Sequence, residues 1–220
     1  MSDFYFHIED YILNHSDPED PVLAELNRET NLKILRPRML SGHLQGKILE
    51  MISKMIRPQK ILEIGTYTGY SAICLAKGLS NNGVLHTIEI NDELEQFIRK
   101  YIKKAGLVKQ IKLHIGNALD IIPQLNEKFD LVFIDGDKRE YLNYYQKIFE
   151  FVKPCGFILA DNVLWSGKVI EKESPDDEYT KGVIEFNEFI KNDFRIEKVI
   201  LPLRDGLVLI RKKVNLKSKE

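Results

Sequence analysis

Lys60-Ile61-Leu62-Glu63-Ile64-Gly65-Thr66-Tyr67-Thr68-Gly69-Tyr70-Ser71 is the stretch from which the fold can be predicted. Its apolar residues form the short run that a parallel β-strand covered on both faces requires: Ile61, Leu62 and Ile64. Two glycines then bound a turn, and residues 71–78 follow helical spacing. A strand, a turn and a helix in this order form a nucleotide pocket. This stretch is therefore the candidate cofactor site.

The side chains of the turn limit what the pocket can hold. A dinucleotide loop needs bare backbone at its second glycine so that the pyrophosphate can approach, but Tyr67 occupies that place. The glycines stand four positions apart instead, at Gly65 and Gly69. Glu89 ends the next apolar stretch, where a carboxylate can accept hydrogen bonds from both hydroxyls of a ribose. A nucleoside without phosphates suggests S-adenosylmethionine.

Three motifs in the same order resemble the cation-dependent O-methyltransferases, a family that contains catechol and caffeoyl-CoA O-methyltransferases. They are residues 63–71 followed by the acidic Glu89, then Phe133-Ile134-Asp135-Gly136-Asp137-Lys138, then Leu159-Ala160-Asp161-Asn162-Val163-Leu164-Trp165. The similarity runs from about residue 10 to residue 211. It implies an α/β, Rossmann-like methyltransferase fold that uses S-adenosylmethionine and a divalent cation.

Length and composition predict one soluble domain over residues 1–220, with 44% hydrophobic and 30% charged residues. We expect a helical cap over residues 1–57, a catalytic α/β core over 58–212 and a tail over 213–220. The formal net charge of −1 provides no general attraction for nucleic acid or an anionic membrane. A small neutral or acidic substrate fits better, and we expect neither a nucleic-acid nor a membrane partner.

The two cysteines, Cys74 and Cys155, share no C-x-x-C spacing. This favours free thiols over a zinc site or a disulfide. The amino terminus is acidic where a signal peptide would be basic, and no apolar run reaches the length of a membrane span. We therefore expect a cytoplasmic protein.

Strand-like runs alternate with helical stretches after residue 60, which predicts a doubly wound parallel sheet with helices on both faces. The expected strands are residues 61–64, 84–90, 111–115, 131–135, 157–161, 195–201 and 206–211, the last two forming an antiparallel hairpin. The expected helices between the strands are residues 71–79, 92–105, 118–125 and 141–152. Seven strands with one reversed match the methyltransferase sheet.

Three helices are expected before the sheet, over residues 4–14, 22–32 and 41–56. Ser41 has two readings: a cap of the third helix, or the cofactor contact that the resemblance places there. In the resembled family this segment also covers one edge of the cofactor site and helps to form a homodimer.

Acidic residues stand at or near the carboxyl ends of four predicted strands: Glu63, Glu89, Asp135 and Asp161. Any one of them alone is commonly a solvated strand-end acid. Asp135 and Asp161 together with Asn162 offer two carboxylates and an amide oxygen, hard ligands suited to Mg²⁺, with Ca²⁺ or Mn²⁺ as alternatives. The bland alternative is that Asp161-Asn162 is a turn after a strand.

The resemblance implies further roles for individual residues. Lys138 falls where the catechol branch of the family has its catalytic lysine, which makes it the candidate general base. The implied cofactor contacts are Ser41, Glu63, Gly65, Thr66, Ser71, Glu89, Ala118, Asp135 and Asp137. Among these, Gly65, Thr66 and Ser71 would hold the methionine end, Glu89 the ribose, and Ala118 with Asp137 the adenine.

Substrate selectivity is expected in residues 163–181, a loop that includes Trp165, and in the amino-terminal helices. A mobile lid is one hypothesis for this loop, in which Trp165 either stacks on an aromatic ring or packs the loop itself. The plant caffeoyl-CoA enzymes carry asparagine at the place of Ser166 and alanine at that of Gly136, which argues against a CoA ester. A small catechol-like substrate is therefore expected. The alternatives are methylation of RNA or protein, or a non-catalytic dimeric protein that binds the cofactor.

Overall fold

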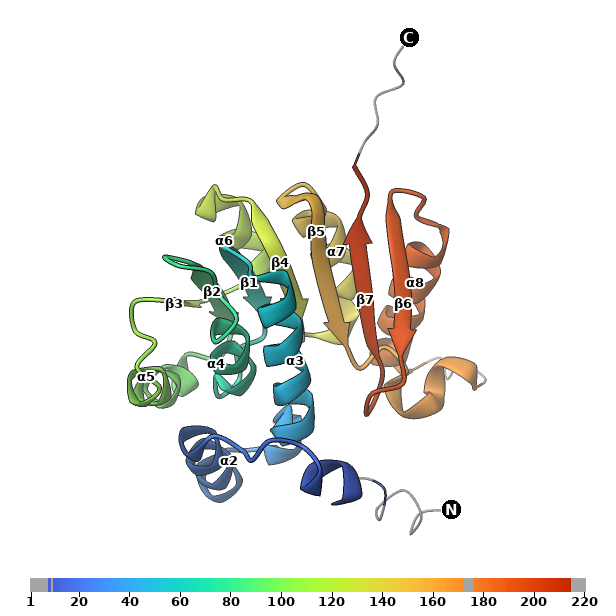
Figure 1. The fold of residues 1–220 in the computed structure, drawn as a ribbon. Coiled ribbons are helices and arrows are strands. Elements are labelled where there is room, and N and C mark those ends of the chain that lie inside the picture. The colour runs from blue at the N-terminus through green and yellow to red at the C-terminus, as the bar shows by residue number, and fades with distance from the viewer. Residues whose placement is uncertain (1–7, 9, 172–175, 215–220) are drawn as a thin grey trace.

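The computed structural model describes residues 8, 10–171 and 176–214, which contain a seven-stranded sheet (Figure 1). Its strand order is β3-β2-β1-β4-β5-β7-β6, and β7 runs antiparallel to both of its neighbours while the other pairs are parallel. The strands are β1 (Lys60–Ile64), β2 (Val84–Glu89), β3 (Ile111–Ile115), β4 (Phe129–Ile134), β5 (Val152–Asp161), β6 (Ile196–Leu201) and β7 (Leu207–Lys212). The predicted fold class and the carboxyl-terminal hairpin are confirmed.

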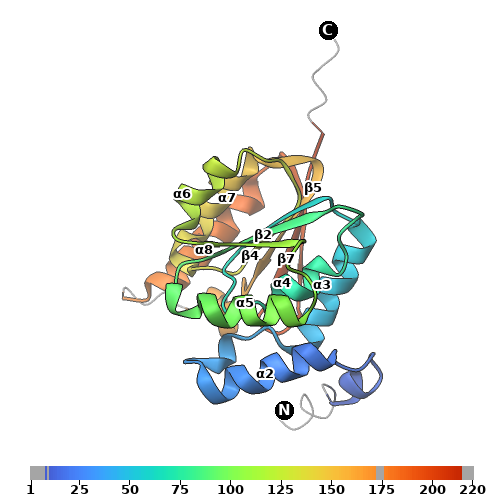
Figure 2. The same ribbon diagram turned by 90° about the vertical axis from the view of Figure 1, so that its left-hand side faces the viewer.

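Helices cover both faces of the sheet (Figure 2). On one face lie α3 (Gly42–Ile56), α4 (Tyr70–Ala76) and α5 (Glu95–Lys104), and on the other α6 (Ala118–Leu125), α7 (Tyr141–Phe149) and α8 (Glu178–Asn192). Successive side chains along each strand point to opposite faces of the sheet, so each strand contributes residues to two separate apolar cores. Ile61 and Leu131 belong to the first core, and Leu62 and Val132 to the second.

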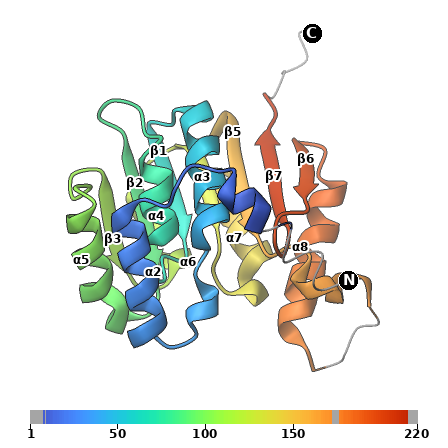
Figure 3. The ribbon, with the colours of Figure 1, turned by 60° about the horizontal axis from the view of Figure 1, so that its bottom comes forward.

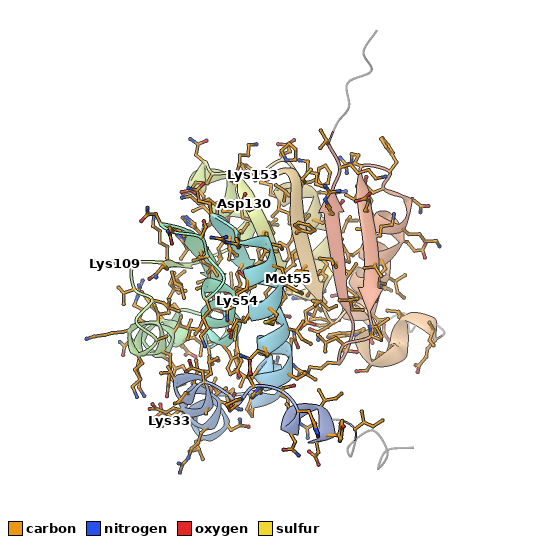
Figure 4. The ribbon with its side chains drawn as sticks, viewed as in Figure 1. Lys33, Lys54, Met55, Lys109, Asp130 and Lys153 are labelled. Atoms are coloured by element: carbon orange, nitrogen blue, oxygen red, sulfur yellow. The ribbon has the colours of Figure 1, made fainter. Side chains whose placement is uncertain are left out.

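The centre of the sheet lies where β1 pairs with β2 on one side and with β4 on the other. Strand order reverses there, and ligands of open α/β sheets bind beyond the carboxyl ends of the strands at such a point. The helix α2 (Pro21–Lys33) and the start of α3 lie at that end (Figure 3). At the opposite end Asp130 accepts hydrogen bonds from the backbone of Gln59 and Lys60 and pairs with Lys153 (Figure 4).

The sequence prediction missed α8. The expected loop over residues 163–181 contains the short 3-10 helix η4 (Trp165–Ile170) and runs into the first turn of α8. Two signals were present: Asp177 accepts a hydrogen bond from the backbone of Thr180 as an N-cap, and Val183, Phe186 and Ile190 follow helical spacing and are buried. A parallel connection from β5 to β6 also requires a crossover element.

Two further boundaries differ from the prediction. β5 begins at Val152 rather than at residue 157, and α7 ends correspondingly earlier, at Phe149. The start of β5 is difficult to recognise in the sequence, because Pro154 and the positive φ of Cys155 interrupt the alternation of side chains that is typical of a strand. Both cysteines are free as expected, Cys74 buried and Cys155 half-buried beside the Arg211 guanidinium.

The amino-terminal segment contains helical residues 10–14, then α2, then the 3-10 helix η1 (Pro37–Met39), which was not predicted. Residues 4–7 and 9 of the expected helix over residues 4–14, residues 172–175 of the expected loop, and residues 215–220 of the expected tail lie outside the described residues. None of the helices in the described part of the chain combines the length and apolar character needed to cross a bilayer.

Candidate active site

A cavity of about 740 Å³ opens at the carboxyl ends of β1, β2 and β4, within the usual size range of small-molecule sites. One wall is the turn from Gly65 to Ser71, and another is the segment from Arg36 to Ser41. Ten predicted site residues line the cavity: Ser41, Gly65, Thr66, Ser71, Glu89, Ala118, Asp135, Asp137, Lys138 and Asn162. The fold therefore brings together side chains that are up to 121 positions apart in the sequence (162 minus 41).

The turn after β1 has a shape that depends on its glycines. Gly65 has a φ of +96°, and a Cβ placed there would lie 2.3 Å from the carbonyl oxygen of Asp135. Tyr67, at a φ of 50°, donates its backbone N–H to Glu89 Oε2 at 2.6 Å. Its hydroxyl is hydrogen-bonded to the carbonyls of Leu35 and Arg36 at 3.1 and 3.2 Å. The turn is thus fixed to β2, to β4 and to the amino-terminal segment.

Glu89 lies at the end of β2 as predicted and faces the cavity. Its Oε1 accepts the backbone N–H of Asn91 at 2.9 Å, and its Oε2 accepts that of Tyr67. Burial raises the pKa of this carboxyl, while these backbone hydrogen bonds lower it. Each oxygen keeps a lone pair, which suits a neighbouring diol.

Glu63 departs from its predicted role, because it is fully buried and does not line the cavity. Thr87 donates its hydroxyl to Glu63 Oε2 at 2.5 Å, and Ser71 is a second hydrogen-bond partner. Burial raises the pKa of Glu63 to about 8, and the charges of Asp135 and Glu89 act in the same direction. Glu63 therefore supports the turn from behind the cavity wall. The alternative interpretation of Glu63 as a solvated acid at a strand end is wrong.

The raised pKa of Glu63 predicts a pH-dependent stability. Between its ordinary pKa of 4.5 and the folded pKa of about 8, the folded state holds a proton that the unfolded state has lost. The free energy of unfolding should therefore fall across this window, by at most about 1.4 kcal/mol per pH unit. Glu63→Gln should remove this part of the slope in urea denaturation followed from pH 5 to 9. Glu185→Gln, at an exposed position on α8, is the control, and an unchanged slope in Glu63→Gln would contradict the assignment.

Lys138 lies in the 3-10 helix η3 (Lys138–Glu140) and is buried rather than solvated. Its Nζ donates to Asp135 Oδ1 at 2.8 Å and to the Tyr141 hydroxyl at 2.5 Å, and that hydroxyl donates to the carbonyl of Asp161 at 3.0 Å. The helix α8 packs closely behind η3, because a Cβ at Gly182 would lie 2.4 Å from the Lys138 carbonyl. The ammonium is thus held at a defined place on the cavity wall.

Asp161 ends β5 at the same edge of the sheet, and Asn162 follows it directly. Asp161 accepts from the side-chain amide of Gln45 at 2.5 Å and from the backbone of Asn162 at 2.9 Å. Burial raises the pKa of Asp161 to about 6, with a further contribution from the negative charge of Asp135. The two carboxylates therefore interact electrostatically. Across residues 8, 10–171 and 176–214, no cluster of three or more His, Cys, Asp or Glu side chains is placed to hold a metal.

Ser41 does not act as a helix cap, since its side chain makes no capping hydrogen bond at the start of α3. The cap reading is therefore wrong, and the residue lies against the cavity instead. Asp137 caps η3 by accepting the backbone N–H of Arg139 at 3.0 Å. The neighbouring Arg139 guanidinium lowers the pKa of Asp137.

Several lining or supporting residues were not predicted: Arg36, Gln45, Tyr141 and Tyr179. Tyr179 stacks on Trp165, with ring centroids 6.3 Å apart and planes at 15°. Trp165 thus packs within the protein and also lines the cavity. The hydrogen bonds from Gln45 and Tyr141 to Asp161 are made across the fold, so no local sequence signal marks them.

Comparisons with known proteins place the chain among the methyltransferases. The O-methyltransferase family model matches residues 13–213. A caffeoyl-CoA O-methyltransferase of Eucalyptus gunnii is 36% identical over 213 residues, which cover 92% of this chain and 86% of that enzyme. Caffeoyl-CoA O-methyltransferase 5 of Nicotiana tabacum is 34% identical, with coverages of 92% and 89%.

Solved structures agree with this assignment. The O-methyltransferase TomG of Streptomyces achromogenes, involved in tomaymycin synthesis and crystallised with SAM, has a TM-score of 0.88 at 27% identity, covering 94% of this chain and 96% of TomG. An O-methyltransferase of Bacillus cereus in complex with SAH has a TM-score of 0.85 at 30% identity, covering 94% and 97%. The chain belongs to the O-methyltransferase family.

Proposed function

We propose that the chain transfers a methyl group from S-adenosylmethionine to one hydroxyl of a small aromatic molecule with two adjacent hydroxyls, assisted by a divalent cation. The observation that carries the proposal is the meeting of Lys138, Asp135, Asp161 and Asn162 at one edge of the sheet, beside a cavity that contains Glu89. The SAM and SAH in the TomG and Bacillus cereus structures support the methyl donor. The caffeoyl group named for the plant relatives is a catechol, which supports the acceptor.

The residues present fit a divalent cation. Asp135, Asp161 and Asn162 would hold it with two carboxylates and an amide oxygen, a donor set suited to Mg²⁺, and to Ca²⁺ or Mn²⁺ as alternatives. The mutual effect of the two acids, seen in the raised pKa of Asp161, is the repulsion that a bound cation would relieve. When bound, the cation would acidify a coordinated hydroxyl and orient adjacent ring oxygens.

The other steps fall to side chains of the chain itself. Glu89 would accept hydrogen bonds from the ribose hydroxyls. Lys138, once its ammonium has lost a proton to solvent, would take the proton of the reacting hydroxyl at Nζ. That oxygen attacks the methyl carbon, the carbon–sulfur bond breaks, and S-adenosylhomocysteine leaves as an uncharged thioether. Asp135 and Tyr141 keep the Lys138 amine in place. Alignment of the two substrates can contribute about 7–11 kcal/mol toward lowering the barrier.

The cation can be tested with Asp161→Asn, which preserves size but removes one carboxylate charge. Turnover of catechols with Mg²⁺ should fall about 100-fold or more, because the cation contributes several kcal/mol of charge stabilisation. Affinity for S-adenosylhomocysteine, measured by calorimetry, should stay within about 2-fold, since Asp161 does not line the larger cavity. Asp92→Asn, at an exposed site, is the matched control. Full turnover in EDTA would rule out the cation.

Two rival functions have distinct tests. Methylation of RNA or protein would appear as labelled methyl groups in bulk tRNA or protein, with no product from a panel of catechols. The net charge of −1 argues against RNA. A non-catalytic binding protein would take up S-adenosylmethionine and yield no product at all. We also propose a homodimer, which sedimentation would test.

A further inference from the structure

A second cavity, of about 450 Å³, adjoins the first. The two share four lining residues: Arg36, Met39, Asn162 and Trp165. Asp161, Arg38 and Arg204 line only the second cavity. A molecule held beside Asp161 and Asn162 would therefore extend from the larger cavity into the smaller one.

Positive charge dominates the second cavity. Three arginines line it, Arg36, Arg38 and Arg204, together with a single acidic residue, Asp161. Within the described residues none of the three arginines forms an ion pair, although many other surface cations do, such as Lys168 with Asp177 at 2.7 Å. Arg204 Nη1 donates only to uncharged acceptors, namely the carbonyls of Leu40 and Ser41 and Gln45 Oε1. The positive charge of Arg204, like the charges of Arg36 and Arg38, is therefore not balanced by an ion pair within the described residues.

The backbone that carries Arg36 and Arg38 is braced. Arg36 has a φ of 57°, and its carbonyl accepts the backbone N–H of Met39 at 3.0 Å and the Tyr67 hydroxyl at 3.2 Å. Pro37 starts the 3-10 helix η1 and fixes its own φ. The two arginines therefore start from a defined turn, which reduces the entropy lost when they bind a ligand.

We propose that this cavity binds a carboxylate carried on the side chain of the acceptor, so that the substrates are dihydroxy-aromatic acids; this rests on the proposed function. Arg36 and Arg38 supply the planar, paired N–H donors that match a carboxylate. The cavity holds more than a carboxylate alone, which favours a side chain of several atoms between ring and acid. The chain has almost no net charge, so the attraction is local to these arginines.

The experiment compares kcat/KM for 3,4-dihydroxycinnamate with that for its uncharged methyl ester, which has the same ring and hydroxyls. The wild type should prefer the acid by about 10-fold. Arg38→Gln, at a position that lines only the second cavity, should lose about 10-fold on the acid and stay within about 2-fold on the ester. Arg28→Gln, an exposed arginine on α2 that lines neither cavity, should behave as the wild type. The CoA thioester is the third substrate. Its anionic groups are phosphates, so it tests whether the arginines bind phosphate rather than carboxylate.

A binding measurement separates this inference from the proposed function. Calorimetry with 3,4-dimethoxycinnamate and its methyl ester needs no turnover, and the acid should bind about 10-fold more tightly in the wild type only. Arginine-dependent binding of the acid without methylation of any catechol would support the carboxylate site and reject the proposed reaction. Equal kcat/KM for acid and ester, equal losses on both in Arg38→Gln, or arginine dependence of the CoA thioester alone would each overturn the carboxylate site.

Discussion

Replacing Lys138 by methionine is expected to lower kcat for a catechol by about 100- to 10,000-fold, the range that a positioned general base contributes. Methionine preserves most of the length of the side chain and removes the nitrogen that contacts Asp135 and Tyr141. Affinity for S-adenosylhomocysteine should change much less, because the proposed ribose contact is Glu89. Initial rates with labelled methyl donor and calorimetry on the same preparations give both quantities.

Lys147→Met is the matched control, since Lys147 lies on the exposed side of α7 and lines neither cavity. Thermal unfolding should accompany the rates, because the change at position 138 also leaves Asp135 without its ion pair. A folded Lys138→Met protein that keeps more than about a tenth of the wild-type kcat would exclude Lys138 as the base.

Gly65→Ala is expected to abolish cofactor binding and to destabilise the protein by several kcal/mol. Two effects combine at this position. The φ of +96° is unfavourable for alanine, at a cost of about 1–2 kcal/mol. The new Cβ would also lie 2.3 Å from the Asp135 carbonyl oxygen and 3.0 Å from the Gly136 nitrogen, so the end of β4 must move away from β1.

Gly106→Ala separates the two effects, because Gly106 has a φ of +72° and a Cβ there would meet nothing within 4 Å. This control should lose only the cost of the backbone conformation, about 1–2 kcal/mol, and should bind S-adenosylhomocysteine normally. Urea denaturation and calorimetry measure the two properties. If both alanine variants lose the same stability and both bind the cofactor, β4 does not constrain the turn.

The sheet and the residues at its carboxyl edge could be predicted from sequence because their signals are local. Ile61, Leu62 and Ile64 are apolar in succession because they feed two cores, and the acids follow at the strand ends. The burial of Glu63 could not be read in this way, since its surroundings come from Thr87 on β2 and Ser71 on α4. An acidic residue in a strand has the same sequence pattern whether it is buried or solvated.

The hydrogen bonds that support the site residues could not be predicted from the sequence either. Gln45 bonds Asp161 across 116 positions and Arg204 across 159, and only the folded chain brings these side chains together. The missed helix α8 is a different case, because the parallel arrangement of β5 and β6 requires a crossover between them. Gly182 and the run of acidic residues before it obscure the helical pattern of α8 in the sequence. The parallel topology alone would have predicted a helix at this place.

The hydroxyl of Tyr67 links two halves of the site that would otherwise be independent. The same residue gives its backbone N–H to Glu89 and its side chain to the carbonyls of Leu35 and Arg36. Any donor molecule that steadies this tyrosine also steadies the wall that carries the arginines. If binding of the methyl donor strengthens binding of the acceptor in this way, thermodynamic reciprocity requires the acceptor to strengthen binding of the donor by the same factor. The ternary complex would then be favoured over either half-filled enzyme.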